Sequence, residues 1–63
     1  MKYKEFTIAM QGMFLQARNS DGFVRFEVRS SMGSGGYTQD DLTRLLRKID
    51  AALITYQQTG LRF

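Results

Sequence analysis

The side chains of this sequence that could do chemistry are arginines and aromatic rings, placed close together in its first half. Guanidinium groups bind phosphates and stack on bases, and exposed aromatic rings give flat surfaces on which unpaired bases stack. Their alternation with apolar residues places several of them on one side of extended segments. The predicted nucleic-acid-binding residues are Arg18, Arg25, Arg29, Phe14, Phe23, Tyr3 and Gln16.

Other kinds of chemistry have little support in the composition. The 63 residues include no Cys and no His, which excludes disulfide scaffolds, thiol or imidazole catalysis and the usual zinc and haem ligands. The carboxylates are dispersed, and the one adjacent pair, Asp40 and Asp41, is explained by helix capping. We therefore expect no enzyme activity, no catalytic residue, no metal site and no cofactor.

The length of the chain indicates how many domains it forms and how large a core it can bury. A chain of 63 residues with a net charge of +3 makes a single domain, 1–63, which buries only about 60% of its unfolded surface. Self-association would compensate for such a small core, so we expect a homodimer. No apolar run reaches the ~18 residues of a membrane span, and the start MKYKEF lacks a signal-peptide core. A cytoplasmic location without membrane contact is expected.

Three segments alternate apolar and polar residues with a period of two, which predicts strands over about 2–10, 13–18 and 23–29. Two hairpin turns connect them, at Gln11-Gly12 and at the four residues from Asn19 to Gly22. Pairing across these turns brings nine apolar residues to one face, and a one-residue slip would scatter them. The predicted inner set is Phe6, Ile8, Met10, Met13, Leu15, Ala17, Val24, Phe26 and Val28.

A helix is predicted over about 38–58, after a flexible Gly/Ser link at 30–37. Thr38 is a suitable N-cap with Asp41 as its capping-box partner, and Gly60 is a suitable stop. The helix carries an apolar stripe at helical spacing: Leu42, Leu45, Leu46, Ile49, Leu53 and Tyr56. The predicted fold class is α+β, a three-stranded antiparallel β-meander followed by one long C-terminal helix packed on one sheet face.

The other sheet face would then be open. The predicted rows across it are Glu5, Arg18 and Phe23, then Thr7, Gln16 and Arg25, then Ala9, Phe14 and Glu27, with Arg29 beyond. A cross-strand ion pair between Glu5 and Arg18 would be a purely structural explanation for that arginine. Burial of Phe14 and Phe23 in a sheet-to-sheet dimer is the corresponding explanation for the rings.

Three weaker features accompany this face. The glycine-rich stretch 33–36 precedes a helix but has no following Lys, so it indicates a connector rather than a phosphate-binding loop. Arg44, Arg47 and Lys48 are typical of a solvated helix face, with phosphate or an acidic partner as the alternative. A C-terminal group could form a contact between copies; its members are Ile54, Leu61 and Phe63.

The segment 23–53, FVRFEVRSSMGSGGYTQDDLTRLLRKIDAAL, resembles the PC4-like single-stranded DNA-binding domains. Its arginine-rich strand is followed by a glycine-containing link and a capped helix. The resemblance aligns Arg25 and Arg29 with the strand basic residues of that family, and Gly36, Leu42 and Ile49 with framework positions. It implies a dimer that binds DNA on the sheet side.

The sequence thus predicts a small non-enzymatic protein that binds single-stranded DNA or RNA through its open sheet face. Two alternatives use the same face. One is a protein-interaction or inhibitor module of the kind formed by small phage-type proteins. The other is duplex DNA binding, with the sheet entering a groove as in the arm domains of integrases.

Overall fold

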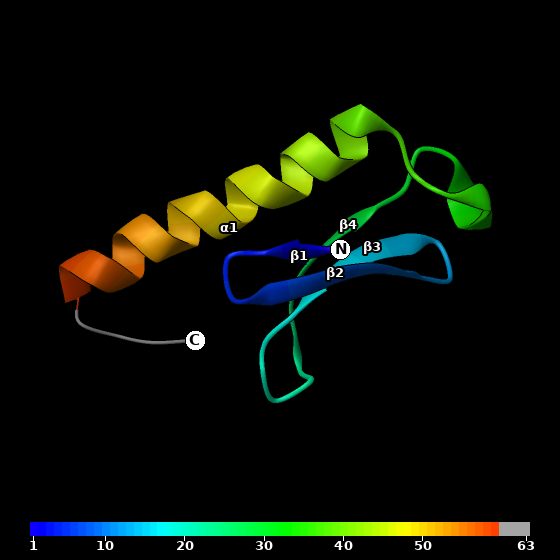
Figure 1. The fold of residues 1–63 in the computed structure, drawn as a ribbon. Coiled ribbons are helices and arrows are strands. Elements are labelled where there is room, and N and C mark those ends of the chain that lie inside the picture. Colours follow the sequence, from blue (N-terminus) through cyan, green and yellow to red (C-terminus); the bar gives the residue numbers. More distant parts are fainter. Residues whose placement is uncertain (60–63) are drawn as a thin grey trace.

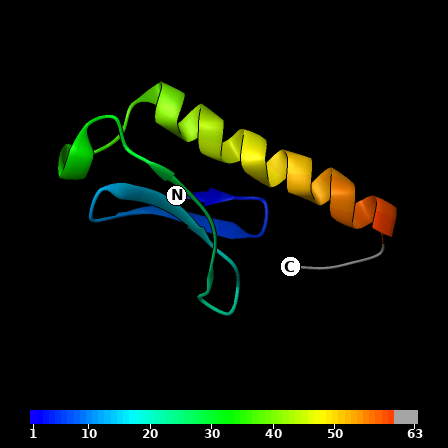
Figure 2. The ribbon, with the colours of Figure 1, turned by 180° about the vertical axis from the view of Figure 1, so that it is seen from behind.

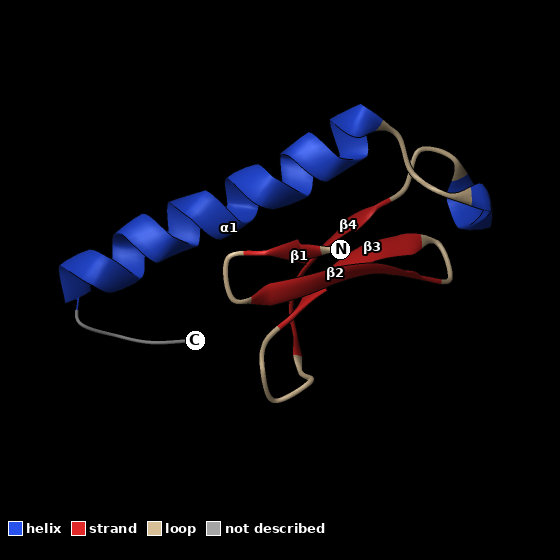
Figure 3. Ribbon diagram, in the orientation of Figure 1, coloured by secondary structure: helices blue, strands red, loops and turns tan. Residues whose placement is uncertain are grey.

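A four-stranded antiparallel sheet and one long helix make up residues 1–59, the part of the chain that the computed structural model describes (Figures 1 and 3). The predicted α+β class, with an antiparallel sheet and a C-terminal helix, is confirmed, whereas the predicted number of strands, three, is wrong. The predicted stop at Gly60 and the contact residues Leu61 and Phe63 lie outside the described residues. The elements in order are β1 (Lys2–Tyr3), β2 (Phe6–Gln11), β3 (Phe14–Arg18), β4 (Val24–Arg29), the short 3-10 helix η1 (Gly33–Gly35) and α1 (Gln39–Thr59).

The additional strand comes from a tight turn within the first predicted strand. Tyr3 pairs with Phe6, so Lys4 and Glu5 form a two-residue turn, and the chain folds back on itself. Lys4 adopts a positive φ of 54°, which a non-glycine residue rarely does. Because neither turn residue is Gly, Asn or Asp, no ordinary turn signal marks this point of the sequence.

The two hairpin registers differ by two residues from the predicted ones. Met10 pairs with Leu15 rather than Met13, and Leu15 pairs with Val28 rather than Phe26. The first turn is therefore centred on Gly12 and Met13, with Gly12 at φ 60° in the position where a primed turn requires a positive φ. Since side chains alternate with a period of two, this shift keeps most residues on their predicted faces. Met13 is one exception, because it lies in the turn and is 43% exposed.

A β-bulge at the start of β4 corrects a second assignment. Ala17 pairs with Phe26, but the next residue, Arg18, pairs with Val24, so Arg25 is the extra residue. A bulge reverses the alternation beyond it. Val24, predicted on the inner face, is consequently 37% exposed, whereas Val28 is buried.

The connection between β3 and β4 is the predicted turn, and it is confirmed in detail. The side-chain oxygen of Asn19 accepts hydrogen bonds from the backbone N–H groups of Asp21 and Phe23, at 3.1 and 3.0 Å. The N–H of Gly22 closes the turn on the carbonyl of Asn19 at 3.0 Å. In both Figure 1 and the reverse view of Figure 2, this hairpin extends away from α1.

The predicted helix start is also confirmed. The N–H of Thr38 donates to Asp41 Oδ2 at 2.9 Å, and the N–H of Asp41 donates to the Thr38 hydroxyl at 3.2 Å. Asp41 Oδ2 further accepts the N–H and hydroxyl of Ser31, and its other oxygen accepts from Arg44. This buried carboxylate therefore joins the start of α1 to the segment that follows β4.

The helix packs on one side of the sheet and leaves the other side uncovered (Figures 1 and 2). The core cluster between the two layers consists of Phe6, Ile8, Leu15, Ala17, Val28, Leu45 and Ile49. Phe6 and Phe26 meet edge to face, with ring centroids 5.5 Å apart. The side of the sheet opposite α1 is called the outer face below.

Candidate nucleic-acid interface

The outer face carries mostly polar and basic side chains in three cross-strand rows. Lys2, Thr7, Arg18 and Val24 form the first row, Ala9, Gln16 and Glu27 the second, and Gln11, Phe14 and Arg29 the third. Arg25 joins the first row through the bulge. All of these residues are exposed or half-buried, so a ligand can reach each of them.

Phe14 and Arg29 are direct cross-strand partners at one end of this face. The Phe14 ring is 37% exposed, and the Arg29 side chain is exposed beside it. The predicted rows had placed Phe14 between Ala9 and Glu27, with Arg29 beyond them. The two-residue register shift therefore brings together a ring and a guanidinium that were predicted to lie one row apart.

A second arginine and ring pair lies at the β3–β4 hairpin, just before β4 begins. The guanidinium of Arg25 stands over the Phe23 ring, 5.8 Å from its centroid, and that ring is 61% exposed. A cation–π contact at an exposed site contributes about 0.5–1 kcal/mol. It also holds a positive charge beside a flat, accessible aromatic surface.

Arg18 and Gln16 connect the middle of the face. Gln16 Nε2 donates to Glu27 Oε2 at 3.1 Å, and Arg18 donates to Gln16 Oε1 at 3.2 Å and to the Gly22 carbonyl at 2.9 Å. The predicted ion pair with Glu5 does not form, because Arg18 lies opposite Thr7 instead. Arg18 is thus oriented by uncharged acceptors, and its positive charge stays available to an anion.

Tyr3 is separated from the other predicted site residues. It pairs with the buried Phe6 and packs against the core on the side that α1 covers. Its hydroxyl donates to both carboxylate oxygens of Asp50, at 2.9 and 3.0 Å, and Lys4 Nζ lies 2.7 Å from Asp50 Oδ1. These bonds lower the pKa of Asp50, Lys4 having the larger effect, and the bond to Asp50 raises the pKa of Tyr3.

Lys2 is the basic residue of the outer face that sequence reasoning missed. It lies opposite Thr7 because β1 folds back on β2, and a single strand over 2–10 could not bring it there. Lys2 is polar and Tyr3 is apolar, which is the alternation of a strand with Lys2 on its outer side. This pattern places Lys2 beside Thr7 only if the chain turns at Lys4 and Glu5.

The arrangement therefore offers four cations and two exposed rings, with Glu27 as the carboxylate of the central row. Such a surface is suited to an anionic ligand that also has flat faces. Within residues 1–59 no cluster of three or more Asp, Glu, His or Cys side chains could hold a metal ion. Nor does any helix in this range combine the length and apolar character needed to cross a bilayer.

Comparisons with known protein families, with curated proteins and with solved structures found no match to this chain. The resemblance to PC4-like domains consequently stays a prediction from the residues.

Proposed function

We propose that this protein binds single-stranded DNA or RNA on the outer face of its sheet. In this proposal Arg18, Arg25 and Arg29 contact phosphates, and Phe14 and Phe23 stack against bases. Gln16, in the central row, offers an amide to a base or sugar. Tyr3 takes no part, since its hydroxyl is bound to Asp50 on the opposite side.

The observation that carries the proposal is that Phe14 and Phe23, two exposed rings, each lie beside an arginine. Phe14 lies opposite Arg29, and Phe23 lies under Arg25. A nucleotide has a flat base and a charged phosphate, so each pair matches both of its parts. Stacking on an aromatic side chain contributes about 1–3 kcal/mol per base, so the two rings would add to the binding energy of the phosphate contacts.

Single strands fit this surface better than duplexes do. Bases in a duplex are stacked on each other, and exposed rings can engage them only after unstacking. The net charge of +3 is modest, so binding that depended on phosphates alone would be weak and salt-sensitive. Ring stacking supplies the additional affinity.

The test is fluorescence anisotropy with labelled single-stranded and duplex oligonucleotides, at low and near-physiological salt. We expect a preference for single strands, and a weaker, less salt-dependent complex for Arg25→Ala. Phe23→Ala should lose affinity at every salt concentration.

The matched controls are Lys4→Gln, which removes a charge at the far edge of the sheet, and Met32→Ala, which truncates an exposed apolar side chain in the link. Unchanged affinity in both test variants would contradict the proposal, and duplex preference would favour groove entry by the sheet.

The alternative of a protein-interaction module is supported by apolar side chains exposed on the outer face and at the adjoining β3–β4 hairpin. Phe14, Phe23 and Val24 are 37%, 61% and 37% exposed, and exposed apolar side chains of this size often mark a protein contact. Phe14→Asp would then abolish capture of a protein partner. Sedimentation of the free protein tests the homodimer expected from the sequence, because burial of these rings between two copies would make Phe14→Asp monomeric.

A further inference from the structure

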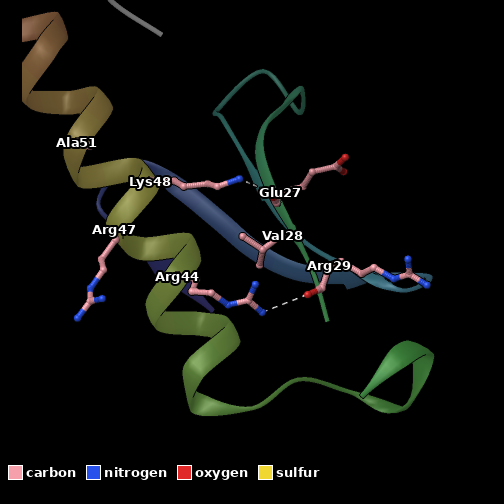
Figure 4. A pocket seen from close by; sticks show the side chains of 7 residues that line it. All are labelled: Glu27, Val28, Arg29, Arg44, Arg47, Lys48 and Ala51. Atoms are coloured by element: carbon pink, nitrogen blue, oxygen red, sulfur yellow. Dashed lines mark hydrogen bonds between the residues drawn. The ribbon is translucent and has the colours of Figure 1, made fainter. Parts of the chain in front are cut away.

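Strand β4 lies at the edge of the sheet, and two basic side chains of α1 reach its outward carbonyl groups (Figure 4). Lys48 Nζ donates to the Glu27 carbonyl at 3.2 Å, and Arg44 donates to the Arg29 carbonyl at 3.3 Å. Lys48 and Arg44 are four residues apart, so they lie on the same side of the helix. Together they bridge α1 to the strand edge.

These contacts border an open cleft of about 530 Å³ between α1 and β4. Four of its lining residues are basic, namely Arg29, Arg44, Arg47 and Lys48, against the single carboxylate of Glu27. In Figure 4 the Glu27 side chain points away from the helix, and Arg47 points away from β4. The charges that face the cleft most directly therefore belong to Lys48 and Arg44.

Lys48 has no carboxylate partner within residues 1–59. Its ammonium has three N–H donors, and the Glu27 carbonyl that accepts from it is uncharged. Arg44 is partly neutralised by Asp41, but its contacts to Asp41 and Arg29 use only one terminal nitrogen, Nη2. The cleft thus combines one uncompensated charge with unused guanidinium donors, and both side chains are already held in place. Holding them in place lowers the entropy lost on binding.

The cleft is continuous with the outer face through Arg29. The carbonyl of this residue faces α1, while its side chain lies beside Phe14 on the outer face. A strand whose base stacks on Phe14 and whose phosphate meets Arg29 would reach the β4 edge with its next phosphates. Lys48 and Arg44 are the cations that it would find there.

We propose that the cleft between α1 and β4 binds backbone phosphates of the same nucleic acid strand, with Lys48 and Arg44 as donors. The inference rests on the proposed function and extends it from the outer face to the β4 edge. It assigns to the helix a share of the binding site, and it predicts that longer oligonucleotides engage a cation that short ones do not reach.

The experiment compares Lys48→Gln with Lys4→Gln, an identical change of charge at the opposite edge of the sheet. Anisotropy is measured over a range of salt concentrations with oligothymidylates of about 4 and about 12 nucleotides, lengths that span typical site sizes. With the longer one, we expect Lys48→Gln to lower the slope of log K against log salt by about 0.7, the value for one phosphate on a single strand. Lys48→Arg should have the wild-type salt slope, because it keeps the charge, and Lys4→Gln should also leave the slope unchanged. The short oligonucleotide should not distinguish the variants.

Failure of this inference differs from failure of the proposed function. If the wild-type protein binds the oligonucleotides but Lys48→Gln behaves like Lys4→Gln, the cleft site is overturned and the outer face stands. If the wild-type protein binds no oligonucleotide, the proposed function fails. Titration with tripolyphosphate, followed by NMR, then tests whether the cleft binds phosphate at all. Amide NMR shifts at Glu27, Arg29 and Lys48 that disappear in Lys48→Gln would support a phosphate site there, and their absence would overturn it.

Discussion

Thr38 and Asp41 hydrogen-bond to each other in both directions, the Thr38 N–H to Asp41 Oδ2 at 2.9 Å and the Asp41 N–H to the Thr38 hydroxyl at 3.2 Å. The same carboxylate accepts two bonds from Ser31 and pairs with Arg44 while only 1% exposed. These contacts, the Thr38 N–H foremost, hold the pKa of Asp41 well below its ordinary range. The charged form of Asp41 therefore stabilises the native state.

This lowered pKa predicts a loss of stability in acid. Asp41 stabilises the fold at pH values above its unfolded pKa of about 4, and this contribution disappears as the pH falls further toward the lower folded value. Asp41→Asn should lower the Tm by roughly 5–10 °C at neutral pH and should flatten the decline of Tm below about pH 4. Thermal melts followed by circular dichroism check this, with the exposed neighbour variant Asp40→Asn as the control. Parallel pH curves for the wild type and Asp41→Asn would contradict the prediction.

The turn at Gly12 should be sensitive to side chains for a conformational reason alone. Its φ is 60°, and no atom lies within 4 Å of the Cβ that alanine would add. Gly12→Ala should therefore cost about 1–2 kcal/mol in backbone strain. Gly35 has equally open space without a positive φ, so Gly35→Ala should be neutral or slightly stabilising. Urea denaturation of the two variants gives the comparison, and equal stabilities would contradict it.

The bulge in β4 predicts opposite outcomes for two valines that a regular strand would place on the same face. Val28 is 6% exposed and Val24 is 37% exposed. Val28→Thr should destabilise the protein by about 1–3 kcal/mol, because it buries a hydroxyl in the core. Val24→Thr should stay within about 0.5 kcal/mol of the wild type. A large loss from Val24→Thr, measured by the same urea unfolding, would argue for the regular register instead.

Tyr3 provides a prediction that separates the two sides of the sheet. Because its hydroxyl binds Asp50 on the helix side, Tyr3→Phe should leave oligonucleotide affinity within about twofold while slightly lowering the Tm. Phe23→Ala should show the reverse pattern, with weaker binding and a nearly unchanged Tm, since that ring is largely exposed. Reduced affinity in Tyr3→Phe, measured by anisotropy, would place this residue at the interface after all.

Much of the fold followed from patterns that are local in the chain. The alternation around Ile8, Leu15 and Val28 predicted which side of each strand is buried, and the three residues are indeed in the core. The capping box at Thr38 and the turn at Asn19 were predicted because their side chains bond within a few residues. The register was missed by two residues, since a period-two pattern is unchanged by such a shift.

The candidate site was less predictable, because it depends on pairings between strands. The sequence predicted Phe14 and Arg29 as site residues but not as neighbours, since their contact requires the true register. The turn at Lys4 lacks the usual turn residues, so the separation of Tyr3 from the site was missed. The contacts of Lys48 and Arg44 with β4 depend on where α1 lies on the sheet, which no spacing within the helix encodes.

The bridging of α1 to β4 has a consequence for the protein at high concentration. An edge strand offers its backbone groups to any other extended chain, which is how sheets grow into aggregates and fibrils. Here the carbonyls of Glu27 and Arg29 are already occupied, and the cations that occupy them would repel the same edge of a second molecule. Lys48 and Arg44 thus protect β4 from strand addition, and loss of both side chains would leave these carbonyls open to pairing with a second molecule.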